Sequence, residues 1–309
     1  MATRLPQLDG GLFLTDGGLE TVLIFHEGID LPEFAAFTLL DDEAGTEQLR
    51  RYYRTYAELA RDQGLGFVLE SPTWRASPRW AAALGISDAK LDELNRGAIA
   101  LMEEIRSEYA DLPVVISGCI GPQDDGYRPA ATLTADEAEA YHATQIGSFA
   151  RTAADLVTAL TMTYAAEAVG VTRAATAAGL PVVISYTLET DGRLPSGQSL
   201  VDAIQECDEA TGAAPAYYMV NCAHPTHFAD VLAEGEPSLE RIGGLRANAS
   251  TRSHAELDEA EELDAGDPAD LGARHAALSA RLPRVTVLGG CCGTDHRHVA
   301  AIRDAWPAA

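Results

Sequence analysis

Residues 164–186 read YAAEAVGVTRAATAAGLPVVISY, an amphipathic helical stretch followed by a short run of β-branched and apolar residues. An apolar run such as 181–186 is typical of a strand that is buried on both faces. The same order of helical stretch and apolar run recurs along the chain. Such alternation predicts a parallel sheet whose strands are connected by crossover helices.

Eight such units can be counted. The expected strands are residues 11–16, 66–70, 113–117, 155–160, 181–186, 216–221, 241–245 and 285–289. The expected helices are residues 46–63, 88–109, 134–151, 164–178, 199–212, 226–234, 268–282 and 295–305, with a short helix at 254–263. Eight repeats predict an α/β fold, a closed (β/α)8 TIM barrel that forms a single domain over residues 1–309. An open doubly wound sheet is the alternative.

Composition narrows the classes of partner. The formal net charge of −25 disfavours binding to nucleic acid or to anionic lipid, because both depend on Lys and Arg that neutralise phosphates. No apolar run is long enough to span a membrane, and the first residues lack the apolar core of a signal peptide. We therefore expect a cytoplasmic protein that acts on small molecules. Its five cysteines, an odd number, favour metal binding or catalysis over a disulfide framework.

Three cysteines follow predicted strands. Cys222 comes after the sixth strand, and Cys291 and Cys292 come after the eighth, within GGCCGTD at 289–295. Functional residues of a (β/α)8 barrel lie on the loops that follow the strands. Adjacent strand residues point to opposite faces, so the pair converges on one ion only if the backbone bends, and the flanking glycines permit a bend. The spacing predicts a zinc site of three thiolates with an open fourth position.

Three thiolate ligands leave zinc a weak electrophile, which favours alkylation of a bound thiol over activation of water. A lone Cys222 would otherwise be interpreted as a small buried apolar residue. We expect Cys119 and Cys207 to be packing residues. The histidines near these motifs are expected to support the site rather than to bind the metal; they are His224, His227, His296 and His298.

These motifs resemble the homocysteine S-methyltransferase family over almost the whole chain. The matching runs are Asp16-Gly17-Gly18 with Thr21, Gly118-Cys119-Ile120-Gly121-Pro122, Asn221-Cys222, Gly289-Gly290-Cys291-Cys292 and, more weakly, Ser196-Gly197-Gln198-Ser199. The resemblance implies a (β/α)8 barrel in which Cys222, Cys291 and Cys292 hold Zn²⁺. It also implies that homocysteine binds the zinc through sulfur. The thiolate then attacks an activated methyl group to give methionine, with no other catalytic residue.

The resemblance further implies which residues bind the substrate. The amino-acid end of homocysteine would lie near Asp16, Gly17 and Gly18, and the full set of expected substrate-binding residues is Asp16, Gly17, Gly18, Glu70, Thr73 and Asn221. The chain departs from the family after its fourth strand, where Leu160 replaces the glutamate that holds the substrate ammonium. An apolar leucine leaves an ammonium unpaired, which is costly in a dry pocket.

A second departure follows the second strand, where the chain reads Glu70-Ser71-Pro72-Thr73-Trp74. We hypothesise that Glu70, or Glu20 beside the Asp-Gly-Gly turn, binds the cationic group of the acceptor or the donor. Pairing of these acids with an arginine such as Arg75 is the alternative. An aromatic side chain could also face the donor cation, and the candidates are Trp74, Tyr164 and Tyr186.

The leading interpretation is transfer of a methyl group from a sulfonium donor, S-methylmethionine or S-adenosylmethionine, to homocysteine. A different thiol acceptor or a betaine-type donor is compatible with the same motifs. Two other classes stay open: a zinc hydrolase, with His224 or His296 completing the site, and a thiol- or zinc-binding protein without catalysis.

Overall fold

The structure is a computed structural model that describes residues 5–127, 132–232, 236–258, 260 and 262–307. Its strands are β1 (Phe13–Leu14), β2 (Gly66–Glu70), β3 (Val114–Ile120), β4 (Leu156–Met162), β5 (Val182–Thr187), β6 (Tyr217–Asn221), β7 (Ile242–Ala247) and β8 (Val287–Gly290). All are parallel and form a closed barrel in sequence order. The predicted (β/α)8 barrel is confirmed. The open sheet is wrong, because Phe13 of β1 pairs with Val287 of β8.

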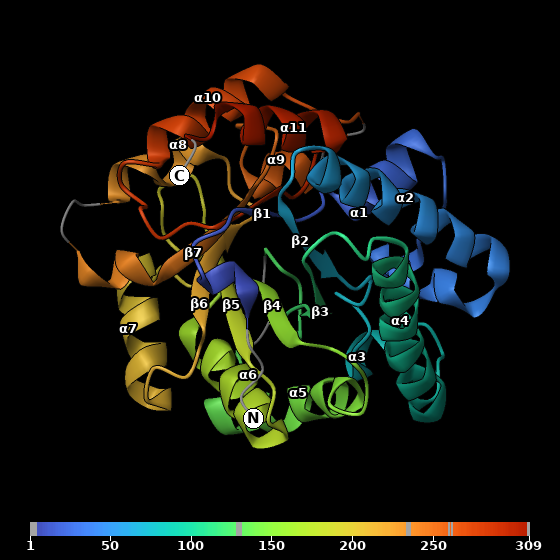
Figure 1. Ribbon diagram of the computed structural model, residues 1–309. Coiled ribbons are helices and arrows are strands. Elements are labelled where there is room, and N and C mark those ends of the chain that lie inside the picture. The colour runs from blue at the N-terminus through green and yellow to red at the C-terminus, as the bar shows by residue number, and fades with distance from the viewer. Residues whose placement is uncertain (1–4, 128–131, 233–235, 259, 261, 308–309) are drawn as a thin grey trace.

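Helices surround the barrel (Figure 1). They are α1 (Leu19–Thr21), α2 (Glu43–Asp62), α3 (Pro78–Ala83), α4 (Asp88–Glu108), α5 (Ala135–Phe149), α6 (Ala165–Ala178), α7 (Leu200–Thr211), α8 (Pro225–Phe228), α9 (His254–Asp258), α10 (Pro268–Leu278) and α11 (His296–Ala305). Helix α6 ends where Gly179 adopts a left-handed conformation (φ 75°), which turns the chain into β5. Among the described residues, no helix is both long and apolar enough to cross a bilayer.

Two predicted helices are shorter in the structure. The helix expected at 226–234 is α8 followed by a 3-10 turn at Ala229–Val231, and residues 233 and 234 lie outside the described residues. The helix expected at 254–263 ends at Asp258, and residues 259 and 261 are likewise not described. The segment after β1 was not predicted: α1 continues into a π-helix, Val22–His26, and two 3-10 turns.

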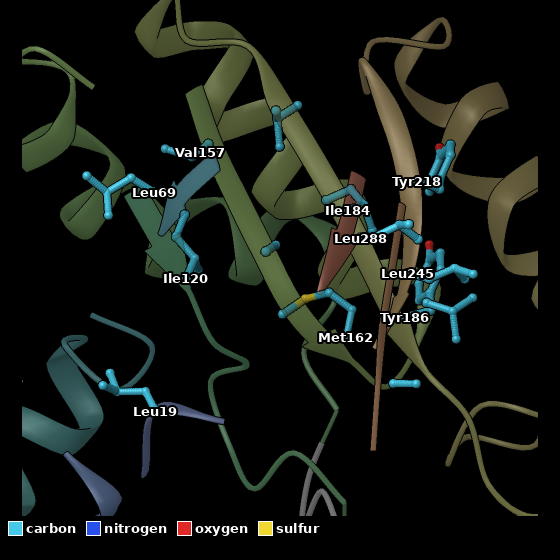
Figure 2. Close-up of a cluster of buried hydrophobic side chains, with 14 of the residues drawn as sticks. Leu19, Leu69, Ile120, Val157, Met162, Ile184, Tyr186, Tyr218, Leu245 and Leu288 are labelled. Atoms are coloured by element: carbon cyan, nitrogen blue, oxygen red, sulfur yellow. The ribbon is translucent and has the colours of Figure 1, made fainter. Parts of the chain in front are cut away.

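Two of the three apolar clusters of the described core form layers of the barrel. The larger one lies between the strands and the helices, and Figure 2 shows part of it, with Leu69 of β2, Ile184 of β5 and Leu288 of β8 among its members. The smaller one fills the inside of the barrel and includes Val68 and Val115. Burying such side chains stabilises the fold by roughly 1.5–3 kcal/mol each.

The inside of the barrel becomes polar toward the carboxyl ends of the strands. Because strand residues alternate, Glu70 faces inward like Val68, two positions before it. Next to it, the hydroxyls of Ser117 and Thr158 lie 2.7 Å apart, and that of Ser185 donates to Asn221 Oδ1 at 2.6 Å. This polar layer forms the floor of the site.

Candidate metal and substrate site

The three predicted cysteines meet at one point. The Sγ atoms of Cys222, Cys291 and Cys292 all lie within 4.8 Å of one another, and those of Cys222 and Cys292 are 3.5 Å apart. No other three His, Cys, Asp or Glu side chains among the described residues come together in this way. Three sulfur donors at this spacing suit a soft, tetrahedral ion such as Zn²⁺. The donor set therefore fits the metal that the sequence predicts.

The backbone of Cys222 is held in an unusual conformation. Its φ of 53° is rarely adopted by a residue with a side chain. The Cys222 carbonyl accepts hydrogen bonds from His254 Nε2 (2.6 Å), Asn248 Nδ2 (3.1 Å) and Thr187 Oγ1 (3.3 Å). Backbone strain of this kind costs on the order of 1–3 kcal/mol and persists only where the surroundings enforce it. These three donors fix the carbonyl, and so aim the thiol.

Glycines make room for the cysteine pair. A Cβ at Gly290 would overlap the side chain of Thr294, and one at Gly18 would lie 2.6 Å from the Cys291 carbonyl oxygen. Gly293 has a φ of 79°, which turns the chain directly after the pair. The turn after β1 can therefore pack against the pair only because these positions lack side chains.

Tyr127 contacts the cluster and was not predicted. Its hydroxyl lies 3.3 Å from Cys222 Sγ and 3.2 Å from Cys292 Sγ. Its ring packs on His254, with centroids 4.0 Å apart. Tyr127 lies in the long connection after β3, where no periodic pattern distinguishes a functional tyrosine from a solvent-exposed one.

Crowding changes the acidity of the thiols. Hydrogen bonds from the Cys222 and Cys292 thiols, together with the positive charge of Arg246, lower the pKa of Cys291 well below its usual value. The contact with Cys291, together with burial, raises the pKa of Cys222, and the contacts with Cys222 and Cys291, together with burial, raise the pKa of Cys292. One thiol in the cluster thus ionises easily and the others resist. A bound cation would favour the thiolate form of all three cysteines.

A pocket of about 660 Å³, including its open mouth, leads to the cluster. Of the predicted substrate-binding residues, those that line it are Asp16, Gly17, Gly18, Glu70 and Asn221. Thr73 does not line it, and its hydroxyl donates to the Cys119 carbonyl at 2.7 Å. The wall also contains Glu20, Trp74 and Leu160.

A buried ion pair lies at the floor of the pocket. Arg246 of β7 donates from Nη2 to Asp16 Oδ1 at 2.7 Å, and both side chains are 5% exposed. Arg246 also donates to the carbonyl oxygens of Gly290 (3.1 Å) and Gly17 (3.2 Å). Arg246 was not predicted as a site residue: it directly follows the strand expected at 241–245, but it belongs to no recognised motif.

Two further carboxyl groups in the pocket are unusually basic. Burial raises the pKa of Glu70 to about 7, against the opposing effects of Arg246 and the Ser117 hydroxyl. Burial likewise raises the pKa of Glu20 to about 7, and the nearby Cys291 adds to this. Arg75 instead pairs with Asp125 at 3.8 Å and stacks on Trp80. The hypothesis that Glu70 or Glu20 binds a cationic group stays a prediction.

The raised pKa of Glu70 predicts a pH-dependent stability. The folded protein holds this proton more tightly than the unfolded chain, so the stabilising contribution is complete below about pH 4.5 and is lost as the pH rises through 7. Each unit of pKa corresponds to about 1.4 kcal/mol, so the loss amounts to up to ~3 kcal/mol. Between pH 5 and 8, the free energy of unfolding measured in urea should fall less for Glu70→Gln than for wild type.

The matched control is Glu137→Gln. Hydrogen bonds from the Thr134 backbone and hydroxyl lower the pKa of Glu137, so its contribution has the opposite sign and grows with rising pH. Parallel unfolding curves for wild type and Glu70→Gln across the whole pH range would contradict the prediction.

The other predicted residues lie away from the thiols. His227 Nε2 donates to the Thr251 carbonyl at 2.9 Å, and His298 Nε2 donates to that of Ala265 at 2.7 Å. The Nδ1 of His224 caps α8. Four more residues also lie outside the pocket lining: Tyr164, Tyr186, Cys207 and His296. Trp74, Tyr53 and Tyr127 are the aromatic residues that line it.

Among the comparisons with known proteins, one identifies a family and another shows the fold. The family model described as homocysteine S-methyltransferase matches residues 13–306. Three structures of the homocysteine methyltransferase MmuM from Escherichia coli share the fold. The oxidized form has a TM-score of 0.76 at 19% identity and covers 95% of each chain. The metallated form has a TM-score of 0.72 at 18% identity and covers 97% of this chain and 98% of that one. The apo form has a TM-score of 0.66 at 18% identity and covers 96% of each. No curated protein matches the chain.

Proposed function

Because the chain belongs to the homocysteine S-methyltransferase family and is therefore a methyltransferase, we propose that it is zinc-dependent and moves a methyl group from a sulfonium donor to homocysteine. The donor we propose is S-methylmethionine or S-adenosylmethionine, and the product is methionine. The observation that carries the proposal is the convergence of Cys222, Cys291 and Cys292 in the pocket at the carboxyl ends of the strands.

The metal fits the site and has a defined use there. Zn²⁺ held by the three cysteines would supply a Lewis acid that keeps a substrate thiol ionised at neutral pH, where a free thiol of pKa about 8.5 is mostly protonated. The residues around it fix the geometry of the ligands. Asn221 contributes through its Nδ2, which lies 3.8 Å from Cys291 Sγ, and Tyr127 through its hydroxyl.

The reaction forms one bond and breaks one. The acceptor sulfur forms a bond to the methyl carbon while the bond from that carbon to the donor's positive sulfur breaks, and the donor departs as a neutral thioether. Charge is neutralised in this step, so a pocket that excludes water favours it. Glu70 lines the pocket and in its ionised form would attract a cationic substrate group, and the aromatic face of Trp74 would offer a second surface for the sulfonium.

The hydrolase alternative has less support. Its candidate ligands, His224 and His296, do not line the pocket, and within the described chain the metal cluster contains cysteine alone. Water activation usually uses histidine or carboxylate ligands. Three thiolates therefore favour thiol chemistry.

The test combines metal analysis with turnover. Zinc per chain is measured first, and homocysteine consumption is then followed with S-methylmethionine, S-adenosylmethionine and betaine in turn. We expect zinc-dependent formation of methionine with a sulfonium donor and none with water alone. Turnover by zinc-free protein, or with betaine alone, would contradict the proposal. Binding of zinc and thiol without turnover with any donor would also overturn it.

Removing the metal should expose the cluster to oxidation. The Sγ atoms of Cys222 and Cys292 lie 3.5 Å apart, so a disulfide between Cys222 and one of the two adjacent cysteines needs little rearrangement. With oxidised glutathione as the oxidant, chelator-treated protein should form this bond and release reduced glutathione. Peptide mass spectrometry should find it in treated wild type and not in zinc-loaded protein. Equal oxidation of zinc-loaded and zinc-free protein would argue against a metal at these thiols.

A further inference from the structure

The turn after β1 has few polar atoms left for a ligand. Asp16 accepts hydrogen bonds from Arg246 and Thr15 at Oδ1 and from Tyr52 at Oδ2, all at 2.7–2.8 Å. The Gly17 carbonyl accepts from Tyr52 and Arg246. The Gly18 amide donates to Thr294. A substrate ammonium or carboxylate placed here would compete with partners that the protein already supplies.

Two other side chains on the pocket wall each have a polar atom without a hydrogen-bond partner. Glu70 Oε2 and Arg246 Nη1 are buried and have no hydrogen-bond partner. Among the described residues with such an unpartnered buried atom, these two are the ones that line the pocket. Leaving a buried polar atom unsatisfied costs about 1–3 kcal/mol, and more for a charged group. Such atoms are rare in folded proteins, and at a pocket they indicate where a ligand binds.

The two groups are an acid and a base that lie close enough to influence each other. Arg246 lowers the pKa of Glu70, and Glu70 raises that of Arg246. The closest carboxylate partner of Arg246 is nevertheless Asp16, not Glu70. A pocket lined by both an acid and a guanidinium matches a ligand group that carries both charges on neighbouring atoms.

Arg246 is also close to the cysteine cluster. It pairs with Asn221 of β6 and with Gly289 of β8, so it lies between the two strands that the cysteines directly follow. A ligand held by Arg246 can therefore reach the thiol cluster through a short chain.

We propose that Arg246 and Glu70 together bind the α-amino-acid group of the acceptor thiol, with Arg246 Nη1 taking the carboxylate and Glu70 Oε2 taking the ammonium. This inference rests on the proposed function and specifies its acceptor as a thiol amino acid. Asp16 is then a positioning residue, which holds the guanidinium of Arg246 through Nη2 and leaves Nη1 for the ligand. The apolar wall at Leu160 needs no charge, because the ammonium is bound on β2 instead.

The test compares three thiols: homocysteine and two analogues that each lack one of its charged groups. Homocysteine carries both groups, 4-mercaptobutanoate carries only the carboxylate, and 3-aminopropanethiol carries only the ammonium. Their dissociation constants are measured by calorimetry on zinc-loaded wild type, Arg246→Lys and Glu70→Gln. Wild type should bind homocysteine at least ~10-fold more tightly than either analogue, since a hydrogen bond to a charged group contributes about 1.5–3 kcal/mol.

Each variant should lose affinity for two thiols and keep it for the third. Arg246→Lys should bind homocysteine and 4-mercaptobutanoate about 10- to 100-fold more weakly and 3-aminopropanethiol normally. Glu70→Gln should instead bind homocysteine and 3-aminopropanethiol more weakly and 4-mercaptobutanoate normally. Glu20→Gln is the matched control, since it removes another carboxylate from the same wall. It should not reproduce the selectivity of Glu70→Gln.

Uniform losses across the three thiols, or the same pattern in Glu20→Gln and Glu70→Gln, would overturn the inference. If Arg246→Lys does not fold, the wild-type affinities and the Glu70→Gln selectivity decide the question. Failure of the proposed function looks different. In that case zinc-loaded wild type binds none of the three thiols, or binds homocysteine without methyl transfer from any donor.

Discussion

Replacing Cys222, Cys291 or Cys292 with alanine should reduce bound zinc from about one ion per chain to below ~0.1 and lower methyl transfer on the order of 1,000-fold. The size of the loss has two sources. A free thiol of pKa about 8.5 is only ~3% ionised at pH 7, which removes a factor of about 30. A substrate sulfur that is no longer fixed in place loses roughly another 100-fold.

The control for this prediction is Cys119→Ala. Cys119 lines the same pocket but does not belong to the group of three sulfur atoms. The Cys119→Ala variant should retain zinc and most of the activity. Zinc is measured by atomic emission on dialysed protein, and activity by homocysteine consumption. Retention of the metal in all three cluster variants, or its loss in Cys119→Ala as well, would show that these cysteines do not form the metal site.

The cysteine cluster could be predicted because its signal is local. Adjacent cysteines between glycines, in GGCCG at the end of a strand, are unusual enough to indicate a site on their own, and Cys222 follows another strand of the same barrel. The rule that functional loops gather at the carboxyl ends of the strands then brings them together. The structure places their sulfur atoms within 4.8 Å of one another, as that rule requires.

Arg246 and Tyr127 could not be predicted, because nothing near them in sequence marks their role. Arg246 becomes significant only when β7 is placed between β6 and β8 and Asp16 is brought from β1, 230 positions away. Tyr127 reaches the thiols from a connection without periodicity. Glu70 was selected as a departure from the family pattern, but its unpartnered oxygen is a property of the folded barrel.

The succession of strand and helix repeats could be predicted from the sequence. Buried strands of a parallel barrel are nearly all apolar, so β2 was predicted with the bounds that it has, Gly66–Glu70. The strand expected at 11–16 is reduced to Phe13–Leu14 because the chain then turns at Asp16 to pack on the cysteine pair. The π-helix and 3-10 turns after it have neither the period of a helix nor that of a strand, so no pattern could indicate them.

Asp16→Ala should destabilise the folded protein by about 3–5 kcal/mol, because it leaves the Arg246 guanidinium buried without its carboxylate. The Tyr52 hydroxyl, which donates to Asp16 at 2.8 Å, loses its acceptor as well. Urea unfolding followed by circular dichroism should show the change as a lower midpoint at an unchanged slope. The comparison is made at equal zinc content, so that metal loss does not contribute.

The matched control is Glu93→Ala, which breaks the exposed pair between Lys90 Nζ and Glu93 Oε1 at 3.0 Å. Solvent screens that pair and Lys90 keeps Asp41 as a partner at 2.7 Å, so the unfolding midpoint should stay close to that of wild type. Replacing both members of the buried pair, in Asp16→Ala with Arg246→Met, should recover much of the stability, because no unpaired charge is left inside. If the double variant were as unstable as Asp16→Ala alone, the cost would come from the altered turn after β1 rather than from the stranded charge. The recovered protein should still bind zinc through its three cysteines, yet bind homocysteine weakly, since the carboxylate would have lost Arg246.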